Sequence, residues 1–312
     1  MSKICMFGIS GSGKTCYLYA MAQVMNNGVR YGDSTHISII SNDLTQQQKL
    51  FDGYYTMAAD SKWPLPSNNT TEYDFNVRVQ HDQQFEELIP SLILQDYAGG
   101  IWQNQTQEGI EQRNALLSDF TQSAAILFIV DSDTLLKAMA NNPQDINASH
   151  RLKYVSTPMP DILRAKQQVS LVENLLKTYK QRNTTIPPVL LVITKGDKFA
   201  DELEKQNAYR YLRQTLPSIF AHGAQLEAAI TTVALGDNLE NIDDKLTGEL
   251  DISIGHNIHI PMLFALYAYL SDVYDGCAPD EQAFIDKLLP IMRKLFADKI
   301  SLYSNGKPLF AV

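Results

Sequence analysis

A glycine-rich segment at residues 8–15 is the first part of the chain whose residue types suggest ligand chemistry. It has the sequence Gly-Ile-Ser-Gly-Ser-Gly-Lys-Thr. In a turn of this kind between a strand and a helix, backbone N–H groups converge on phosphate oxygens, and the helix dipole adds favourable potential. Lys14 would reach the terminal phosphates and the Thr15 hydroxyl would ligate a bridging Mg²⁺. The residues predicted to contact the phosphates are Gly8, Ser10, Gly11, Ser12, Gly13, Lys14, Thr15 and Cys16.

A second motif, Thr194-Lys195-Gly196-Asp197, directly follows the apolar run 189–193. The Asp197 carboxylate can accept from both the ring N–H and the exocyclic amino group of guanine, a pair of donors that adenine does not present. The aliphatic stem of Lys195 would lie over the base. The Thr194 hydroxyl would tie this loop to the glycine-rich loop. The motif therefore favours a guanine nucleotide.

A third candidate lies between these two, where the apolar run 92–94 leads into Gln95-Asp96-Tyr97-Ala98-Gly99. A carboxylate at the end of such a strand is well placed to associate with the Mg²⁺ of a bound nucleotide. Gly99 would offer its backbone N–H to the terminal phosphate. Asp96 is thus a predicted metal-associated residue, and Gly99 is a predicted catalytic residue together with Lys14.

The elements that must position these motifs alternate along the chain. Strand-length apolar runs recur at 4–7, 37–40, 92–94, 124–130, 189–193 and 228–234, and helical patterns at 14–25, 108–120, 161–179, 201–220 and 261–274. This alternation predicts crossover units on a mainly parallel sheet, because continuous apolar strands require cover on both faces. Residues 73–80 alternate between apolar and polar, which predicts a half-exposed edge strand able to pair antiparallel.

The segments between these elements are expected to enlarge the surface. Residues 63–71 and 138–160 are rich in Asn, Pro and Ser or His, and predict loops or surface insertions. The long connections 45–71 and 135–160 are where a partner-binding surface is expected. A further helix over 281–297 is followed by a polar tail.

The three motifs, in this order, resemble the Ras-like and translation-factor class of P-loop GTPases. The resemblance implies a three-layer α/β P-loop NTPase fold, with a mainly parallel central sheet flanked by helices and an added C-terminal helix. It implies a GTPase domain with insertions over residues 1–275 and a C-terminal helical extension, 276–312, packed on the same domain. It also implies binding of GTP or GDP with Mg²⁺, and a nucleotide-controlled switch acting on a protein effector or regulator.

The resemblance implies further site residues. A switch loop should donate a threonine to Mg²⁺, for which Thr71 and Thr70 are the candidates, with Thr56 and Thr45 as alternatives. The metal set is then Thr15, Thr71 and Asp96. The loop after the strand 228–233 would bring Ala234, Leu235 and Gly236 near the base.

One departure from the class concerns hydrolysis. Gly100 stands where many relatives have a glutamine that orients the attacking water, so hydrolysis is expected to be slow. Gln103 and Gln105 follow closely, and a transition-state arginine could come from Arg113, Arg151 or a partner. Losing one positioning group lowers the rate without abolishing nucleotide binding. A GTP-binding scaffold without hydrolysis therefore remains an alternative, as does an ATP-using P-loop enzyme.

The amino-acid composition limits the kinds of partner and compartment that these hypotheses allow. The formal net charge of −9 argues against a broad electrostatic hold on nucleic acid or anionic lipid. The 3 cysteines are too few and scattered for a disulfide framework or a zinc site. No stretch approaches the roughly 18 apolar residues of a membrane span. The expectation is a cytoplasmic protein.

Overall fold

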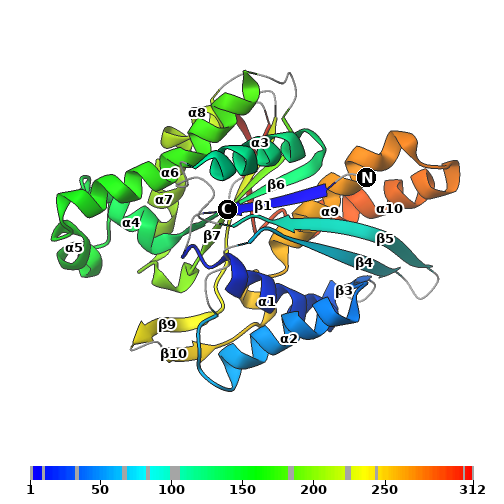
Figure 1. The fold of residues 1–312 in the computed structure, drawn as a ribbon, viewed down its shortest axis with the longest axis horizontal. Helices are drawn as coiled ribbons and strands as arrows, with labels where there is room; N and C mark the ends of the chain where they lie inside the picture. Colours follow the sequence, from blue (N-terminus) through cyan, green and yellow to red (C-terminus); the bar gives the residue numbers. More distant parts are fainter. Residues whose placement is uncertain are drawn as a thin grey trace.

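A mixed β-sheet forms the middle layer of the molecule. A computed structural model describes residues 3–8, 11–31, 35–64, 69–81, 85–98, 106–181, 186–221, 226–242, 245–304 and 306–310. The strands of the sheet in these ranges are β1 (Lys3–Gly8), β2 (Val29–Tyr31), β3 (Thr35–Ser41), β4 (Thr71–His81), β5 (Phe85–Asp96), β6 (Ser123–Asp131), β7 (Val189–Thr194), β8 (Glu227–Thr232), β11 (Ser301–Ser304) and β12 (Lys307–Phe310). Their order across the sheet is β12-β11-β8-β7-β6-β1-β5-β4-β3-β2 (Figure 1).

The centre of the sheet is parallel, as the sequence predicts. β1 pairs in parallel with β5 and β6, and β7 pairs in parallel with β6 and β8. Every residue of β6 and β7 is buried, because helices cover both faces there. The carboxyl ends of these strands lie at one edge, which is where ligands bind in open α/β sheets.

The helices lie in two layers, one on each face of the sheet (Figure 1). Alternate residues of β1 separate the two cores: Ile4 and Met6 belong to one, Cys5 and Phe7 to the other. The first core contains side chains of α1 (Lys14–Asn26), α2 (Leu44–Ala58), α9 (Ile260–Val273) and α10 (Pro279–Phe296). The second contains side chains of α3 (Gln107–Thr121), α4 (Ser132–Met139), α5 (Ala148–Val155), α6 (Met159–Lys180), α7 (Glu202–Thr215) and α8 (Pro217–Phe220). The three-layer α/β prediction is confirmed.

The alternating segment 73–80 is half-exposed and pairs antiparallel as predicted, but its predicted position at the edge of the sheet is wrong. It lies within β4, which pairs antiparallel with both β3 and β5, while β2 closes this side of the sheet. Tyr73, Phe75, Val77 and Val79 are buried in the first core, whereas the residues between them are partly or fully exposed. The alternation therefore reports a sheet covered on one face, which strands inside a sheet can also show.

Two predicted loops contain helices. Residues 45–71 include most of α2, whose N-cap Asp43 accepts from the N–H groups of Thr45 and Gln46. Residues 138–160 include α5, which Asn147 caps in the same manner. Both helices bury few side chains, so their apolar periodicity is weak. The predicted helix 201–220 is divided into α7 and α8, because Pro217 cannot continue the hydrogen-bond ladder of α7.

A separate hairpin follows β8. Its strands, β9 (Gly236–Ile242) and β10 (Lys245–Leu250), pair antiparallel as a 2-stranded sheet. The hairpin lies beside α1 and α2 (Figure 1), and an isolated bridge joins Lys62 to Lys245. Neither this hairpin nor the strands β11 and β12 in the polar C-terminal tail were predicted from the sequence.

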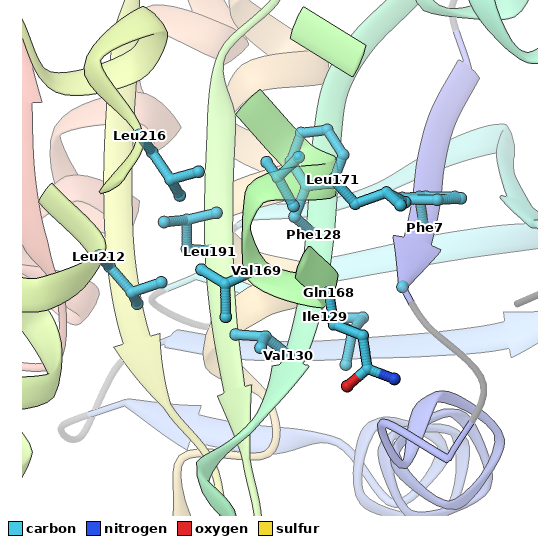
Figure 2. Close-up of a pocket in the computed structure, with 12 residues that line it drawn as sticks. Phe7, Phe128, Ile129, Val130, Gln168, Val169, Leu171, Leu191, Leu212 and Leu216 are labelled. Atoms are coloured by element: carbon cyan, nitrogen blue, oxygen red, sulfur yellow. The ribbon is translucent and has the colours of Figure 1, made fainter. Parts of the chain in front are cut away.

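A small apolar cavity lies between β1, β6, β7 and α6 (Figure 2). Its volume is about 10 Å³, which is about the least space that can hold one water molecule. Most of its lining is apolar, including Phe7, Phe128 and Leu191, with the Gln168 amide as a polar exception. It is a packing defect of the second core, and a phosphate-bearing ligand would find neither space nor partners there. None of the helices in the described ranges combines the length and apolarity needed to cross a lipid bilayer.

Candidate functional site

The turn between β1 and α1 requires glycine at two positions. A Cβ on Gly8 would lie 2.5 Å from the carbonyl oxygen of Ile129 on the neighbouring strand β6. Gly13 is the N-cap of α1 and has a φ of 81°, in the left-handed region. The loop can therefore pass close to the sheet and enter α1 with its first N–H groups free of side-chain caps. Ser10 lies outside the described residues.

The Lys14 side chain folds back over this loop. Its Nζ donates to the Gly8 carbonyl oxygen at 2.8 Å, and the residue is 7% exposed. Burial lowers the pKa of the Lys14 ammonium, and the nearby charge of Asp96 acts in the opposite direction. A buried cation at a helix N-terminus makes this turn a favourable place for an anion.

Hydrogen bonds join the glycine-rich loop to the loop after β7. Thr194 Oγ1 donates to the Ser12 carbonyl oxygen at 2.6 Å. Lys195 Nζ donates to the Gly11 carbonyl oxygen at 3.2 Å. The expected tie between these loops is confirmed. Two segments more than 180 residues apart are thereby held as one surface.

The end of β6 holds Lys195 from the other side. Ser132 Oγ donates to the Lys195 carbonyl oxygen at 2.6 Å, and Asp131 Oδ1 lies 3.5 Å from Lys195 Nζ. Lys195 itself has a φ of 56°, in the left-handed region. Ser132, the first residue of α4, thus supports this backbone, whereas Asp131 at the end of β6 holds the Lys195 side chain. The sequence analysis did not single them out, although their place after an apolar strand is a usable signal.

Asp197, in the loop after β7, also has a side chain held in place by neighbouring groups. Its side chain is 3% exposed, and its Oδ2 accepts from the Leu239 N–H at 3.1 Å. Lys198 Nζ lies 3.6 Å from the same oxygen. Burial raises the pKa of Asp197, while Lys198 and the Leu239 N–H lower it. The carboxylate is a fixed acceptor for a ligand that reaches this point.

A cavity of about 580 Å³ connects these groups, a size typical of small-molecule sites. Its lining is Gly11, Ser12, Gly13, Lys14, Thr15, Cys16, Tyr17, Trp63, Pro64, Asp133, Lys153, Thr194, Lys195, Asp197, Lys198, Val233, Leu235, Leu239 and Glu240. Leu235, which was predicted to lie near the base, is one of the lining residues. Ala234 is absent from this set, and its N–H donates to the His256 carbonyl oxygen.

Thr71 and Asp96 lie directly opposite one another in the β4–β5 register. Asp96 is 3% exposed, and its Oδ1 has no hydrogen-bond partner among the described residues. Burial raises the pKa of Asp96 to about 6, and the charge of Lys14 opposes this shift. A buried carboxylate oxygen without a donor is costly. Its chemistry fits an additional cation, with a threonine hydroxyl as a neighbouring oxygen ligand.

Comparison with protein families supplies the decisive observation. The family model Double-GTPase 1 matches residues 5–229. The chain belongs to the Double-GTPase 1 family. The match contains the whole glycine-rich segment with its lysine, together with Asp96 and the motif that ends in Asp197. The resemblance to P-loop GTPases is thereby confirmed, and this family member is a GTP-binding protein.

Similarity to individual proteins is distant. The small COPII coat GTPase of Encephalitozoon cuniculi, an ADP-ribosylation-factor-like GTP-binding protein crystallised with GDP, is 14% identical with a TM-score of 0.33. That alignment covers 75% of this chain and 69% of the other. A variant of the protein SsGBP is 10% identical with a TM-score of 0.31, over 75% of this chain and 50% of the other. A comparison with curated protein sequences gives no match.

Several predicted residues of this Double-GTPase 1 protein lie outside the described ranges. They are Gly99, Gly100, Gln103 and Gln105. The two candidate arginines are on helices: Arg113 is in α3, and Arg151 is in α5 with its Nε donating to the Ile146 carbonyl oxygen. Neither arginine is in the cavity lining.

Some lining residues carry no motif signal. Trp63 comes from the segment after α2, Asp133 and Lys153 come from the α4–α5 insertion, and Leu239 and Glu240 come from β9. Each is brought to the cavity by an insertion whose path depends on tertiary packing. Periodicity and motif spacing could not have located them.

Proposed function

We propose that this protein binds GTP and GDP with Mg²⁺ and acts as a nucleotide-controlled switch for protein partners. The observation that supports this most directly is the pair of hydrogen bonds from Thr194 and Lys195 to the glycine-rich loop. They bring a phosphate-binding turn and a guanine-compatible carboxylate to one cavity. A single ligand with phosphates at one end and guanine at the other satisfies both.

The roles of the residues follow from their chemistry. Backbone N–H groups at the start of α1 and the Lys14 ammonium would hold the phosphates. The Asp197 carboxylate would accept from the ring N–H and amino group of guanine, and the Lys195 stem would pack on the base. These assignments remain predictions of this proposal.

The proposed metal ligands are Thr15, Thr71 and Asp96. The orphaned Asp96 oxygen and its register with Thr71 support this assignment. When bound, Mg²⁺ would neutralise charge on the phosphoryl oxygens. The chain's own contribution would be the Thr15 hydroxyl at the start of α1, the Thr71 hydroxyl on β4 and the buried Asp96 carboxylate, with the charge of Lys14 nearby.

Hydrolysis of GTP is proposed to be slow. Lys14 and the Gly99 N–H are the groups assigned to the terminal phosphate, whereas Gly100 has no side chain to orient water. In phosphoryl transfer the protein mainly positions the nucleophile and stabilises charge. A partner that supplies a positioning group or an arginine would therefore accelerate the reaction.

Competitive nucleotide binding tests the ligand assignment. Wild-type protein is expected to prefer GTP to ATP, and Asp197→Ala is expected to abolish this preference while leaving residual phosphate-dependent binding. The control is Asp298→Ala, because the Asp298 side chain is 75% exposed and distant in sequence from the motifs. Preference of the wild type for ATP, or GTP preference that survives Asp197→Ala, would contradict the proposal.

Single-turnover hydrolysis tests the catalytic part. The expected result is slow conversion of bound GTP to GDP that Lys14→Ala removes. If bound GTP stays intact through many hours with Mg²⁺ present, the protein is a GTP-binding scaffold and the enzymatic part of the proposal fails.

A further inference from the structure

The β9–β10 hairpin contributes directly to the base end of the cavity. Leu239 and Glu240 of β9 line it, together with Asp197. The hydrogen bond from the Leu239 N–H to Asp197 Oδ2 is a main-chain contact from one element to the carboxylate of another. A donor of this kind limits how the carboxylate can turn.

An apolar cluster anchors the hairpin to α2. Leu239 and Leu246 are 7% and 9% exposed and pack with the fully buried Met57 of α2. Trp63 packs against the same cluster. Ile242, on the same hairpin, is 52% exposed. The hairpin therefore has an anchored face and a solvent face.

The main chain anchors the hairpin a second time. The Leu246 N–H donates to the Ser61 carbonyl oxygen at 2.7 Å, and Lys62 forms a bridge with Lys245. The hairpin is thus attached to the segment between α2 and β4. The attachment point, Ser61, is two residues before Trp63, which lines the cavity. These contacts keep the Leu239 N–H in place.

A charge arrangement at the same point keeps the Asp197 carboxylate available. Lys198 Nζ lies 3.6 Å from Asp197 Oδ2 and 3.6 Å from Glu240 Oε1. The ammonium is equally close to both carboxylates, so it pairs with Glu240 as well as with Asp197. The acceptor capacity of Asp197 is preserved for another donor.

We propose that the β9–β10 hairpin is a specificity-determining element, in which the Leu239 N–H positions the Asp197 carboxylate to recognise guanine. The inference rests on the proposed function, because it assumes that Asp197 contacts the base. Leu239 is a positioning residue and acts through Asp197. A carboxylate held from one side presents both oxygens in a fixed direction, which favours a base with two adjacent donors over a base with one.

Inosine triphosphate is the probe, because hypoxanthine keeps the ring N–H of guanine and lacks the amino group. Leu239→Pro removes the N–H donor, and Leu239→Ala is the matched control that loses the same side chain and keeps the donor. The GTP-to-ITP affinity ratio of Leu239→Pro is expected to fall about tenfold to 100-fold below that of Leu239→Ala, the range of one hydrogen bond to a charged group. A purely structural role would weaken both nucleotides equally and leave the ratio unchanged, and that result would overturn the inference.

A second pair of variants covers the case in which proline prevents folding. Leu246→Asp detaches the anchored face of the hairpin, whereas Ile242→Asp places the same carboxylate on the solvent face. The GTP-to-ITP ratio should fall in the first variant and stay at the wild-type value in the second. Equal ratios in both variants would also overturn the inference. Wild-type protein that does not prefer GTP to ATP would instead refute the proposed function itself.

Discussion

Thr194 shows how much of the site depends on single atoms. Its hydroxyl lies between β7 and the glycine-rich loop and donates to the Ser12 carbonyl oxygen. Both residues are buried, at 4% and 1% exposed, so water cannot readily replace this contact. The relative placement of the phosphate and base groups therefore depends on it.

Replacing Thr194 with valine tests this tie. The shape is kept while the hydroxyl is lost, so affinity for GTP and ATP is expected to fall about fivefold, since one buried hydrogen bond contributes on the order of 1 kcal/mol. The preference for GTP over ATP should remain, because Asp197 is untouched. Thr178→Val is the control, because that hydroxyl bonds only within α6. Equal affinities in wild type and Thr194→Val, measured by calorimetric titration, would show that this hydrogen bond does not contribute to nucleotide binding.

Lys14 is expected to contribute to binding far more than to stability. In Lys14→Met, nucleotide affinity should fall by at least about 100-fold, in line with the loss of a charge-assisted contact to phosphate. Removing a buried ammonium offsets the lost bond to Gly8, so the free energy of unfolding without nucleotide should change by less than about 1 kcal/mol. Urea unfolding and nucleotide titration of this variant and of the exposed Lys287→Met give the comparison. A large loss of stability with retained binding would contradict this role.

At the residue scale, the part of the candidate site that could be predicted from the sequence consists of local motifs. The glycine-rich loop, Asp96 and the motif ending in Asp197 could be proposed from the sequence as site residues, because strand ends and turn chemistry constrain their spacing. Leu239 and Trp63 were not recognised. A backbone N–H has no sequence signature, and these contacts exist only once the insertions pack.

The start of α9 carries a pH-sensitive group. His259 is 3% exposed, and burial, with a smaller effect of the Lys299 charge, lowers its pKa from 6.5 to about 4. Below pH 6.5 the unfolded chain takes up a proton that the folded protein does not, so stability falls as the pH decreases from 6.5 toward 4. At pH 5 this loss is about 2 kcal/mol.

Urea unfolding at pH 7 and pH 5 measures this effect. The drop in free energy of unfolding between the two pH values should be smaller by about 2 kcal/mol in His259→Gln than in wild type. Identical drops in the two proteins would show that His259 is not buried in its neutral form.

At the element scale, long apolar elements were predicted and polar or short ones were not. β6 and β7 are buried along their whole length, and their mostly apolar composition indicates this directly. α2 buries only Leu50 and Met57, so its periodicity was too weak to identify a helix. β9 and β10 are mostly polar and depend on an anchored face of few residues, which only the fold supplies.

At the scale of the whole molecule, residues 276–312 are proposed to pack as part of the same domain. α10 buries Phe284, Ile285, Leu288, Met292 and Phe296 in or against the first core. β11 pairs with β8 and so extends the central sheet. An extension attached in this way contributes to the core as well as to the edge of the sheet.

Deleting residues 276–312 tests this arrangement. Exposing five apolar side chains, at roughly 1.5–3 kcal/mol each, is comparable with the whole stability of a typical domain. The free β8 edge would also favour aggregation. The truncated chain is expected to lose its cooperative thermal transition by circular dichroism. A transition at the wild-type temperature would show that the extension is independent of the domain.

The whole cavity is proposed to hold phosphates at one end and to recognise guanine through Asp197 at the other. Titration of Asp197→Asn with GDP and with xanthosine diphosphate tests it most directly. An asparagine amide can donate where the carboxylate accepts, and xanthine presents a carbonyl where guanine presents its amino group. The predicted result is a reversal of preference, from GDP in the wild type to xanthosine diphosphate in the variant. Unchanged preference for GDP in Asp197→Asn would contradict the account.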